Sequence, residues 1–215
     1  GNNFINEPLD KAVRLTALVS EGEKEMILLA KAYQDGHKSK IEKHRDALLL
    51  LYPRDERVQT WAGWSYYINE NYDEAIGHFR MATRLNENFH PAYSMLGRSM
   101  AIMGNIKEAE KALKKYIELL PENVNSYVTY AKFLQEEGRF DEAIKPYMKA
   151  LELDPKFITI HKDLGDIALF KGDNNSARQH YRDLYLNAST SGIKFWALQL
   201  ESSVYLHENN ITGAL

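Results

Sequence analysis

One short phrase recurs along this chain at a fixed interval of 34 residues. It reads GRFDEA at residues 138–143, GNIKEA at 104–109 and ENYDEA at 70–75, and returns more loosely as GDNNSA at 172–177. Other positions keep the same step: a series of small residues (Gly63, Gly97, Ala131, Gly165), a series of large ones (Phe79, Leu113, Tyr147, Tyr181), and prolines at 53, 121 and 155. Such self-similarity predicts a row of identical supersecondary units that bury their apolar faces against one another.

Each repeat predicts two helices joined by a tight turn. Apolar residues at spacings of three and four indicate a first helix over residues 126–136. Gly138 suits the left-handed conformation that ends many helices, and Asp141 suits the cap of a second helix. A proline such as Pro155 then ends that second helix. The small residues of the series lie where the two helices approach each other, opposite the large ones.

The spacing of these residues resembles the tetratricopeptide repeat. The residues that carry the resemblance are Tyr93, Leu96, Gly97, Ala109, Leu113 and Pro121 in one repeat, and Tyr127, Tyr130, Ala131, Leu134, Ala143, Tyr147, Ala150 and Pro155 in the next. The resemblance implies an all-α fold, a right-handed α-solenoid of antiparallel helix pairs. It also implies a concave face lined by the first helices, which is the usual ligand groove of the family.

We expect a single tetratricopeptide-repeat domain over residues 1–215. Its full repeats cover 56–89, 90–123, 124–157 and 158–191. Residues 22–55 form a degenerate repeat in which Ile41 replaces an alanine and Arg45 an aromatic residue. Residues 1–21 are expected to hold the second helix of an earlier repeat, over 6–19. Residues 192–215 form an incomplete repeat, with a helix over 194–208 and the turn phrase again at 209–214.

Two local expectations accompany these boundaries. Pro146 lies inside a second helix, which it is expected to bend without breaking. Because the chain stops inside a repeat, we expect it to be part of a longer protein or to have lost a tail.

Composition excludes several classes of function. The formal net charge of −3 argues against nucleic acid as the main partner, because phosphate binding needs excess positive charge. No apolar run approaches the roughly 20 residues that span a bilayer, so no membrane insertion is expected. The chain has no cysteine, which excludes disulfides, thiolate metal sites and a cysteine nucleophile. Gly1 stands where a start methionine is expected and is interpreted as a cleavage boundary, so the location stays open between cytoplasm and export.

Catalysis has little support in the sequence. The seven histidines show no His-Glu-x-x-His pattern and no metal-ligand spacing, and no phosphate-binding loop occurs. His78 and His180 stand at the same repeat position, which favours a structural role for both. We therefore predict that the chain is not an enzyme and has no catalytic residue, no metal ligand and no cofactor.

The family resemblance implies a peptide-binding groove. Its commonly groove-facing positions correspond here to Tyr33, Arg57, Thr60, Trp64, Tyr67, Ser94, Arg98, Asn125, Lys132, Gln135, Lys162, Asp166 and Phe170. This set is aromatic near its start and carries Arg98, Lys132 and Lys162 further on, which suits an extended peptide with apolar anchors and some acidic character. The alternatives are that the aromatic residues fill the core and that the basic ones belong to a solvated face.

The leading hypothesis is a non-enzymatic scaffold that binds a peptide segment or a partner helix of another protein. The alternative is a regulatory or sensing region of a longer protein whose activity lies in a domain absent here. A third class is an enzyme with its site at one end of the solenoid. Some family members hold the C-terminal carboxylate of heat-shock chaperones through a lysine, asparagine and arginine clamp. Here Thr60 and Trp64 occupy its starting positions, Met95 the middle one, and Asn125 and Thr129 the last pair, so no such clamp is expected. Self-association through the terminal repeats is a further expectation.

Overall fold

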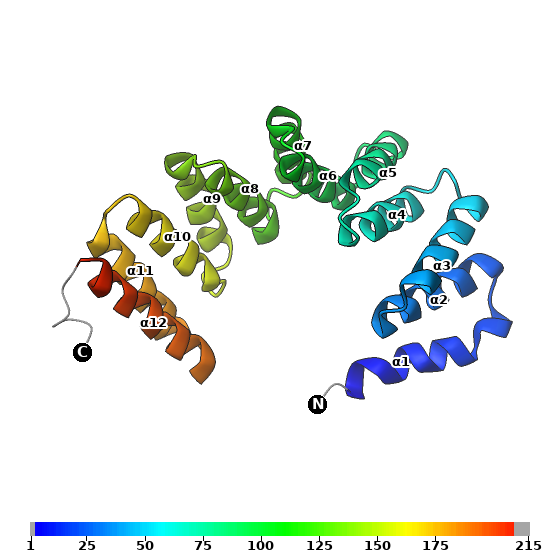
Figure 1. The fold of residues 1–215 in the computed structure, drawn as a ribbon, viewed down its shortest axis with the longest axis horizontal. Helices are drawn as coiled ribbons and strands as arrows, with labels where there is room; N and C mark the ends of the chain where they lie inside the picture. The colour runs from blue at the N-terminus through cyan, green and yellow to red at the C-terminus, as the bar shows by residue number, and fades with distance from the viewer. Residues whose placement is uncertain (1–2, 209–215) are drawn as a thin grey trace. The chain divides into compact units, whose positions relative to one another are not determined.

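The structure of the protein, a computed structural model, describes residues 3–208, which form helices joined by short turns (Figure 1). The chain divides into two compact units, residues 1–119 and 120–215, called the N-terminal and C-terminal units below. The N-terminal unit contains α1 (Asn3–Arg14), a 3₁₀ helix (Thr16–Leu18), α2 (Glu21–Asp35), α3 (Lys38–Leu51), α4 (Glu56–Ile68), α5 (Tyr72–Leu85), α6 (His90–Ile102) and α7 (Ile106–Leu119). The C-terminal unit contains α8 (Val124–Glu136), α9 (Phe140–Leu153), α10 (Thr159–Phe170), α11 (Asn174–Asn187) and α12 (Ser191–His207). No helix within residues 3–208 is long and apolar enough to cross a bilayer.

The predicted all-α fold is confirmed, and every full repeat forms one pair of packed helices. The pairs are α4 with α5 and α6 with α7 in the N-terminal unit, and α8 with α9 and α10 with α11 in the C-terminal unit (Figure 1). The large residues of the series are the centre of each pair: Phe79 and Tyr147 are fully buried, and Leu113 and Tyr181 nearly so. They lie so close to the small residues opposite that a Cβ added to Gly165 would come within 2.4 Å of the Tyr181 ring. The small residues are therefore needed for helix contact.

The turn inside each pair needs a left-handed residue. Gly104 has φ +75° there, and the glycines at 138 and 172 take the same conformation. The equivalent residue of the first full repeat is Glu70, whose φ of +60° makes it the one non-glycine residue with positive φ among those that the structure describes. A side chain in this conformation is strained, because its Cβ approaches the following carbonyl oxygen.

We expect Glu70→Gly to stabilise the N-terminal unit. The left-handed conformation costs a non-glycine residue about 1–2 kcal/mol, and this exceeds the roughly 0.5–1 kcal/mol that glycine loses in chain entropy on folding. The matched opposite change is Gly104→Ala, which meets no neighbouring atom within 4 Å but must adopt φ +75°. Compared with the unaltered chain, Glu70→Gly should unfold at a higher urea midpoint and Gly104→Ala at a lower one. Equal midpoints for both variants would contradict strain at Glu70.

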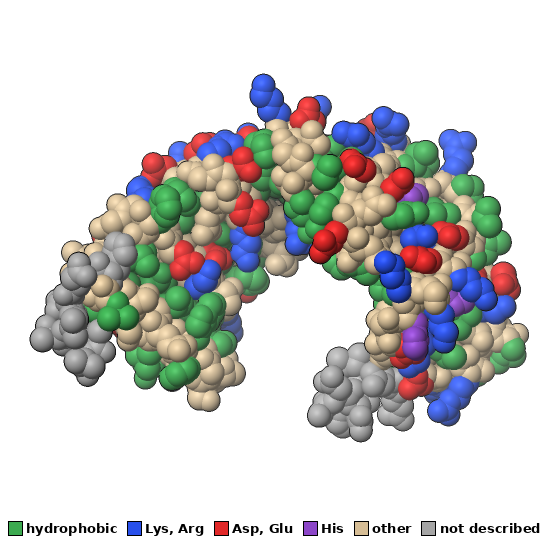
Figure 2. Space-filling view, viewed as in Figure 1, with side chains coloured by type: hydrophobic (Ala, Val, Ile, Leu, Met, Phe, Trp, Pro, Cys, Tyr) green, Lys and Arg blue, Asp and Glu red, His purple; other side chains and the backbone are tan. Residues whose placement is uncertain are grey.

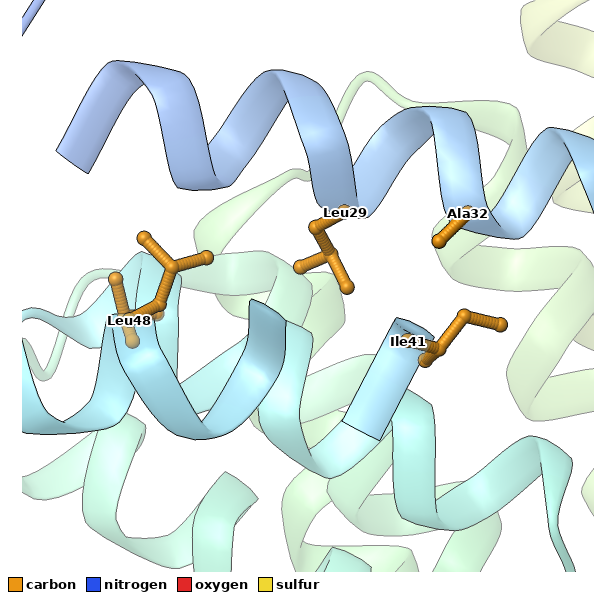
Figure 3. Close-up of a cluster of buried hydrophobic side chains, with 5 residues drawn as sticks. Leu29, Ala32, Ile41 and Leu48 are labelled. Carbon is orange, nitrogen blue, oxygen red and sulfur yellow. The ribbon is translucent and has the colours of Figure 1, made fainter. Parts of the chain in front are cut away.

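The degenerate repeat folds as an ordinary helix pair. Leu29 and Ala32 of α2 face Ile41 and Leu48 of α3 in a buried cluster (Figure 3). Arg45 occupies the position expected to be aromatic, and its side chain is also buried. Its guanidinium lies 4.4 Å from the centre of the Tyr66 ring, and Nη1 donates to Ser65 Oγ at 3.3 Å. Arg45 therefore joins α3 to α4.

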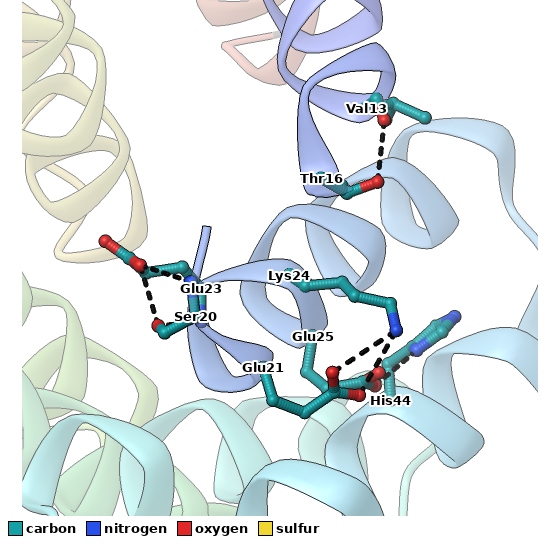
Figure 4. A network of polar contacts seen from close by, with 8 residues as sticks. All are labelled: Val13, Thr16, Ser20, Glu21, Glu23, Lys24, Glu25 and His44. Carbon is teal, nitrogen blue, oxygen red and sulfur yellow. Dashed lines mark hydrogen bonds and ion pairs between the residues drawn. The ribbon is translucent and has the colours of Figure 1, made fainter. Parts of the chain in front are cut away.

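The two ends differ in detail from the prediction. The first helix ends at Arg14, before the predicted residue 19, and a 3₁₀ helix follows it. Ser20 then begins α2 through a capping box, in which its hydroxyl accepts from the Glu23 amide and Glu23 accepts from the Ser20 amide (Figure 4). At the other end α12 begins at Ser191, because the Thr190 side chain accepts from the Ile193 amide. The turn phrase expected at 209–214 lies outside the described residues. Helix α9 continues through Pro146, so the proline does not break it.

A polar contact joins the two helices of several repeats. It links one residue of the first helix to the residue 19 positions later on the second. In the degenerate repeat, Glu25 Oε2 lies 2.6 Å from His44 Nδ1, and both side chains are buried (Figure 4). In the next repeat, Gln59 Oε1 lies 2.7 Å from His78 Nδ1. The structural role predicted for His78 is consistent with this contact.

Candidate functional site

Aromatic side chains gather on the surface of the N-terminal unit around α4. The Trp64 and Tyr67 rings stack with centres 5.7 Å apart and planes inclined by 12°. Tyr72 of α5 meets Tyr67 edge-on at 5.4 Å. Arg98 of α6 holds its guanidinium 5.6 Å from the centre of the Tyr67 ring. The structure thus brings together three residues of the predicted groove, Trp64, Tyr67 and Arg98.

A second tryptophan extends this cluster. Trp61 lies three residues before Trp64, and residues three apart on a helix are surface neighbours. Trp61 is 39% exposed and Trp64 40% exposed, so neither indole fills the core. We refer to Trp61, Trp64, Tyr67, Tyr72 and Arg98 as the aromatic–arginine surface. The groove prediction missed Trp61 and Tyr72, although the helical spacing of Trp61 to Trp64 was available in the sequence.

The other predicted groove residues of this unit make local contacts. Arg57 pairs with Asp55 at 2.6 Å, and this hydrogen bond is the main cause that lowers the pKa of Asp55, which caps α4. Thr60 donates to the Glu56 carbonyl within its own helix, and Ser94 is half-buried on α6. Tyr33 packs against the α2–α3 cluster, and burial of its ring raises the pKa of its hydroxyl. Tyr33 therefore contributes to packing in the N-terminal unit.

In the C-terminal unit, three predicted residues meet at one cavity. Lys132 and Gln135 of α8 and Lys162 of α10 line a space of about 430 Å³, together with Glu136, Phe140 and Asp163. Asp166 and Phe170 line a second space of about 410 Å³ with Leu169 and Gly172. The Phe170 side chain is 74% exposed, and its ring centre lies 4.4 Å from that of Phe140. Asn125 is exposed at the start of α8 and lines neither cavity.

The lysines at this cavity lie beside acidic groups. Lys162 Nζ lies 2.6 Å from Asp166 Oδ2, and Lys132 Nζ lies 4.0 Å from Asp163 Oδ2. Burial raises the pKa of Asp163, and the two lysines partly oppose that shift. Burial alone would lower the pKa of Lys162, but its hydrogen bond to Asp166 and the negative charges of Asp166 and Asp163 together outweigh burial and raise that pKa. The basic stretch expected here is therefore balanced by carboxylates, and Figure 2 shows acidic and basic side chains interspersed on the visible face.

A further cavity lies over α6 and α7 of the N-terminal unit. It measures about 850 Å³ and has Leu96 and Met100 at its apolar side and lysines of α7 around it. None of the predicted groove residues belongs to the set that lines it. The exposed aromatic residues lie elsewhere, on the aromatic–arginine surface. This cavity is therefore the weaker candidate for a protein-binding site, despite its size.

Comparison with known proteins agrees with this architecture. Residues 90–123 match a family model described as tetratricopeptide repeat, and residues 134–172 match one described as TPR repeat. Human tetratricopeptide repeat protein 6 is 29% identical over 115 residues, which are 52% of this chain and 22% of that protein. The peroxisomal targeting signal receptor of Kluyveromyces lactis is 29% identical over 116 residues, 54% of this chain and 20% of that protein. The chain thus spans about a fifth of the length of these relatives.

A solved structure shares the fold over most of the chain. The type IV pilus biogenesis factor PilW superposes with a TM-score of 0.76 over 91% of this chain and 90% of that one, at 14% identity. The period of 34 residues, the paired helices, the buried large residues and the two repeat-family matches agree with one another. The chain therefore contains tetratricopeptide repeats.

Proposed function

We propose that this chain is a non-enzymatic protein-binding module and that the aromatic–arginine surface holds an extended segment or a helix of another protein. The observation that supports it is the pair of indoles on α4, each about two-fifths exposed, beside an arginine stacked on Tyr67. Tryptophan, tyrosine and arginine dominate the binding energy of protein interfaces, because each combines a large apolar area with a polar group. Exposing two indoles to water side by side is unfavourable unless a ligand covers them.

The chemistry of the surface specifies the ligand class. The rings accept aromatic or large aliphatic side chains, and the Arg98 guanidinium suits a carboxylate on the ligand. Lys132, Gln135 and Lys162 form a second candidate contact in the C-terminal unit, where the matched charges suit a polar segment. One relative is named as a receptor for a targeting signal, and recognition of a short segment is the property that we propose for this chain too.

The alternative is a regulatory or sensing region of a longer protein. It is favoured by the finding that the chain covers about a fifth of its relatives. Both functions would use the same surface, because a regulatory region also acts by binding a segment. Self-association through the last repeat stays a prediction, and it is consistent with the exposed Phe195 and Leu198 of α12.

Selection from a random peptide library displayed on phage tests the proposal. Peptides enriched on the whole chain should carry an aromatic or large aliphatic residue near Asp or Glu. Trp64→Ala should weaken their binding by at least about 30-fold, the equivalent of a 2 kcal/mol hot spot. Arg98→Glu should remove the preference for acidic peptides.

Trp196→Ala provides the matched control, because Trp196 is 38% exposed on α12 of the other unit. It should bind the enriched peptides as the unaltered chain does. If Trp64→Ala and Trp196→Ala bind them with the same affinity, the aromatic–arginine surface is not the binding site.

A further inference from the structure

Two histidines and an aspartate meet between α10 and α11. His161 lies on α10, and His180 and Asp183 lie three residues apart on α11. The Nδ1 atoms of His161 and His180 are 3.4 Å apart, and His161 Nδ1 lies 4.0 Å from Asp183 Oδ2. One ligand atom of each residue falls within 4.8 Å of the other two. Among the residues that the structure describes, this is the one such group of potential metal ligands.

The position that His180 occupies on its helix has a different partner in other repeats. His44 and His78 each face an oxygen acceptor, from Glu25 and Gln59, at 2.6 and 2.7 Å. His180 instead faces a second imidazole at 3.4 Å, a separation beyond the usual range for a hydrogen bond. The residues of the earlier repeats that correspond to Asp183 are Lys149, Lys115, Met81 and Ala47. Only the last full repeat therefore places three ligating groups together.

We propose that His161, His180 and Asp183 bind a divalent transition-metal ion of the zinc class. In tetrahedral coordination with Zn–N bonds of about 2.0–2.1 Å, two ligand nitrogens stand roughly 3.4 Å apart. The observed imidazole pair already has this separation. The Asp183 oxygen, 4.0 Å from His161 Nδ1, needs to approach by roughly 0.7 Å to reach the same ligand separation, which a side-chain rotation can supply. Two nitrogens and one carboxylate oxygen suit zinc, and three protein ligands leave a fourth position open.

The surroundings favour metal binding. Burial lowers the pKa of both histidines, and the neighbouring imidazole lowers that of His180 further, so the neutral form that ligates metals is favoured. The Gln179 amide donates to Asp183 Oδ1 at 3.0 Å and orients the carboxylate, leaving Oδ2 for the ion. The side chains of His161 and Asp183 keep 17% and 30% of their exposure, which leaves a path from solvent. The proposal departs from the prediction that no metal ligand is present.

Calorimetric titration of the tag-free, chelator-dialysed chain with Zn²⁺ tests the site. We expect one ion per chain, and Co²⁺ in its place should give the visible absorption of a tetrahedral complex. His161→Gln recreates the Gln59–His78 pair of the first full repeat, so this variant should fold normally, as circular dichroism can verify. Its affinity for Zn²⁺ should nevertheless fall by more than roughly 10–100-fold, which is the loss when a residue that only orients a metal ligand is removed. Gln179→Ala should weaken binding within that range.

His78→Gln is the control, because it removes a histidine at the same repeat position of the N-terminal unit. It should leave affinity and stoichiometry unchanged. The proposal is overturned if the unaltered chain binds no Zn²⁺ above the level of a His161→Gln, Asp183→Asn double variant. It is also overturned if folded His161→Gln retains the full affinity, since the ion then binds at other histidines.

Discussion

Phe79→Ala is expected to lower the free energy of unfolding of the N-terminal unit by about 3–5 kcal/mol, the range for loss of a buried phenylalanine ring. Phe79 is fully buried between α4 and α5, and its ring occupies the space that Gly63 leaves free. Alanine removes the apolar surface and leaves a cavity, which the close helix contact at Gly63 prevents from collapsing. Such a loss approaches the whole stability of a small domain.

Phe195→Ala is the control for this prediction. Phe195 is 64% exposed on α12, so its removal should change stability by less than about 0.5 kcal/mol. Urea unfolding followed by circular dichroism measures both variants. A Phe79→Ala midpoint equal to that of Phe195→Ala would show that the series of large residues does not hold the repeats together.

Arg45→Ala is expected to destabilise the N-terminal unit by about 3 kcal/mol. The variant loses a desolvated cation–π contact with Tyr66, worth about 2 kcal/mol, and a charged hydrogen bond to Ser65, worth about 1.5–3 kcal/mol. Because these terms overlap, their sum is an upper limit. Arg45→Met should recover part of the loss, since a long apolar side chain fills the space that the buried arginine occupies.

Arg57→Ala is the control, because it shows how much stability is lost when an exposed arginine is removed. The Arg57 side chain is 66% exposed, and its ion pair with Asp55 is on the surface, so the variant should lose less than about 1 kcal/mol. Both variants are compared by urea unfolding. If they lose the same stability, Arg45 does not join α3 to α4 as described.

The helix pairs could be predicted because several independent positions repeat together. The small residue at Gly97, the large one at Leu113 and the turn at Gly104 each specify the same helix pair, so errors at one position are corrected by the others. The strained Glu70 could be located in the same way, since its register requires a left-handed residue. The helix ends near residues 14–21 and 191 differ from the prediction, because capping by Ser20 and Thr190 depends on single side chains.

The contacts between helices could not be predicted from periodicity alone. The sequence showed Arg45 only as a departure from the repeat pattern, because burial of a guanidinium depends on the Tyr66 ring of the next pair. Local metal-ligand spacing does not reveal His161 and His180, because they lie 19 residues apart and meet across two helices. The ion pair of Lys162 with Asp166, four residues later, could have been predicted from the helical spacing. It reduces the basic character that was expected of the groove.

The most direct test of the binding proposal uses the three tryptophans of the chain, Trp61, Trp64 and Trp196. Each indole N–H gives a separate signal in a ¹H–¹⁵N spectrum, and single Trp→Phe variants assign them. A peptide enriched by the selection above is added to saturation. We predict that the Trp64 signal shifts while that of Trp196 stays in place. A Trp64 signal that does not move when the peptide saturates the protein would contradict binding at the aromatic–arginine surface.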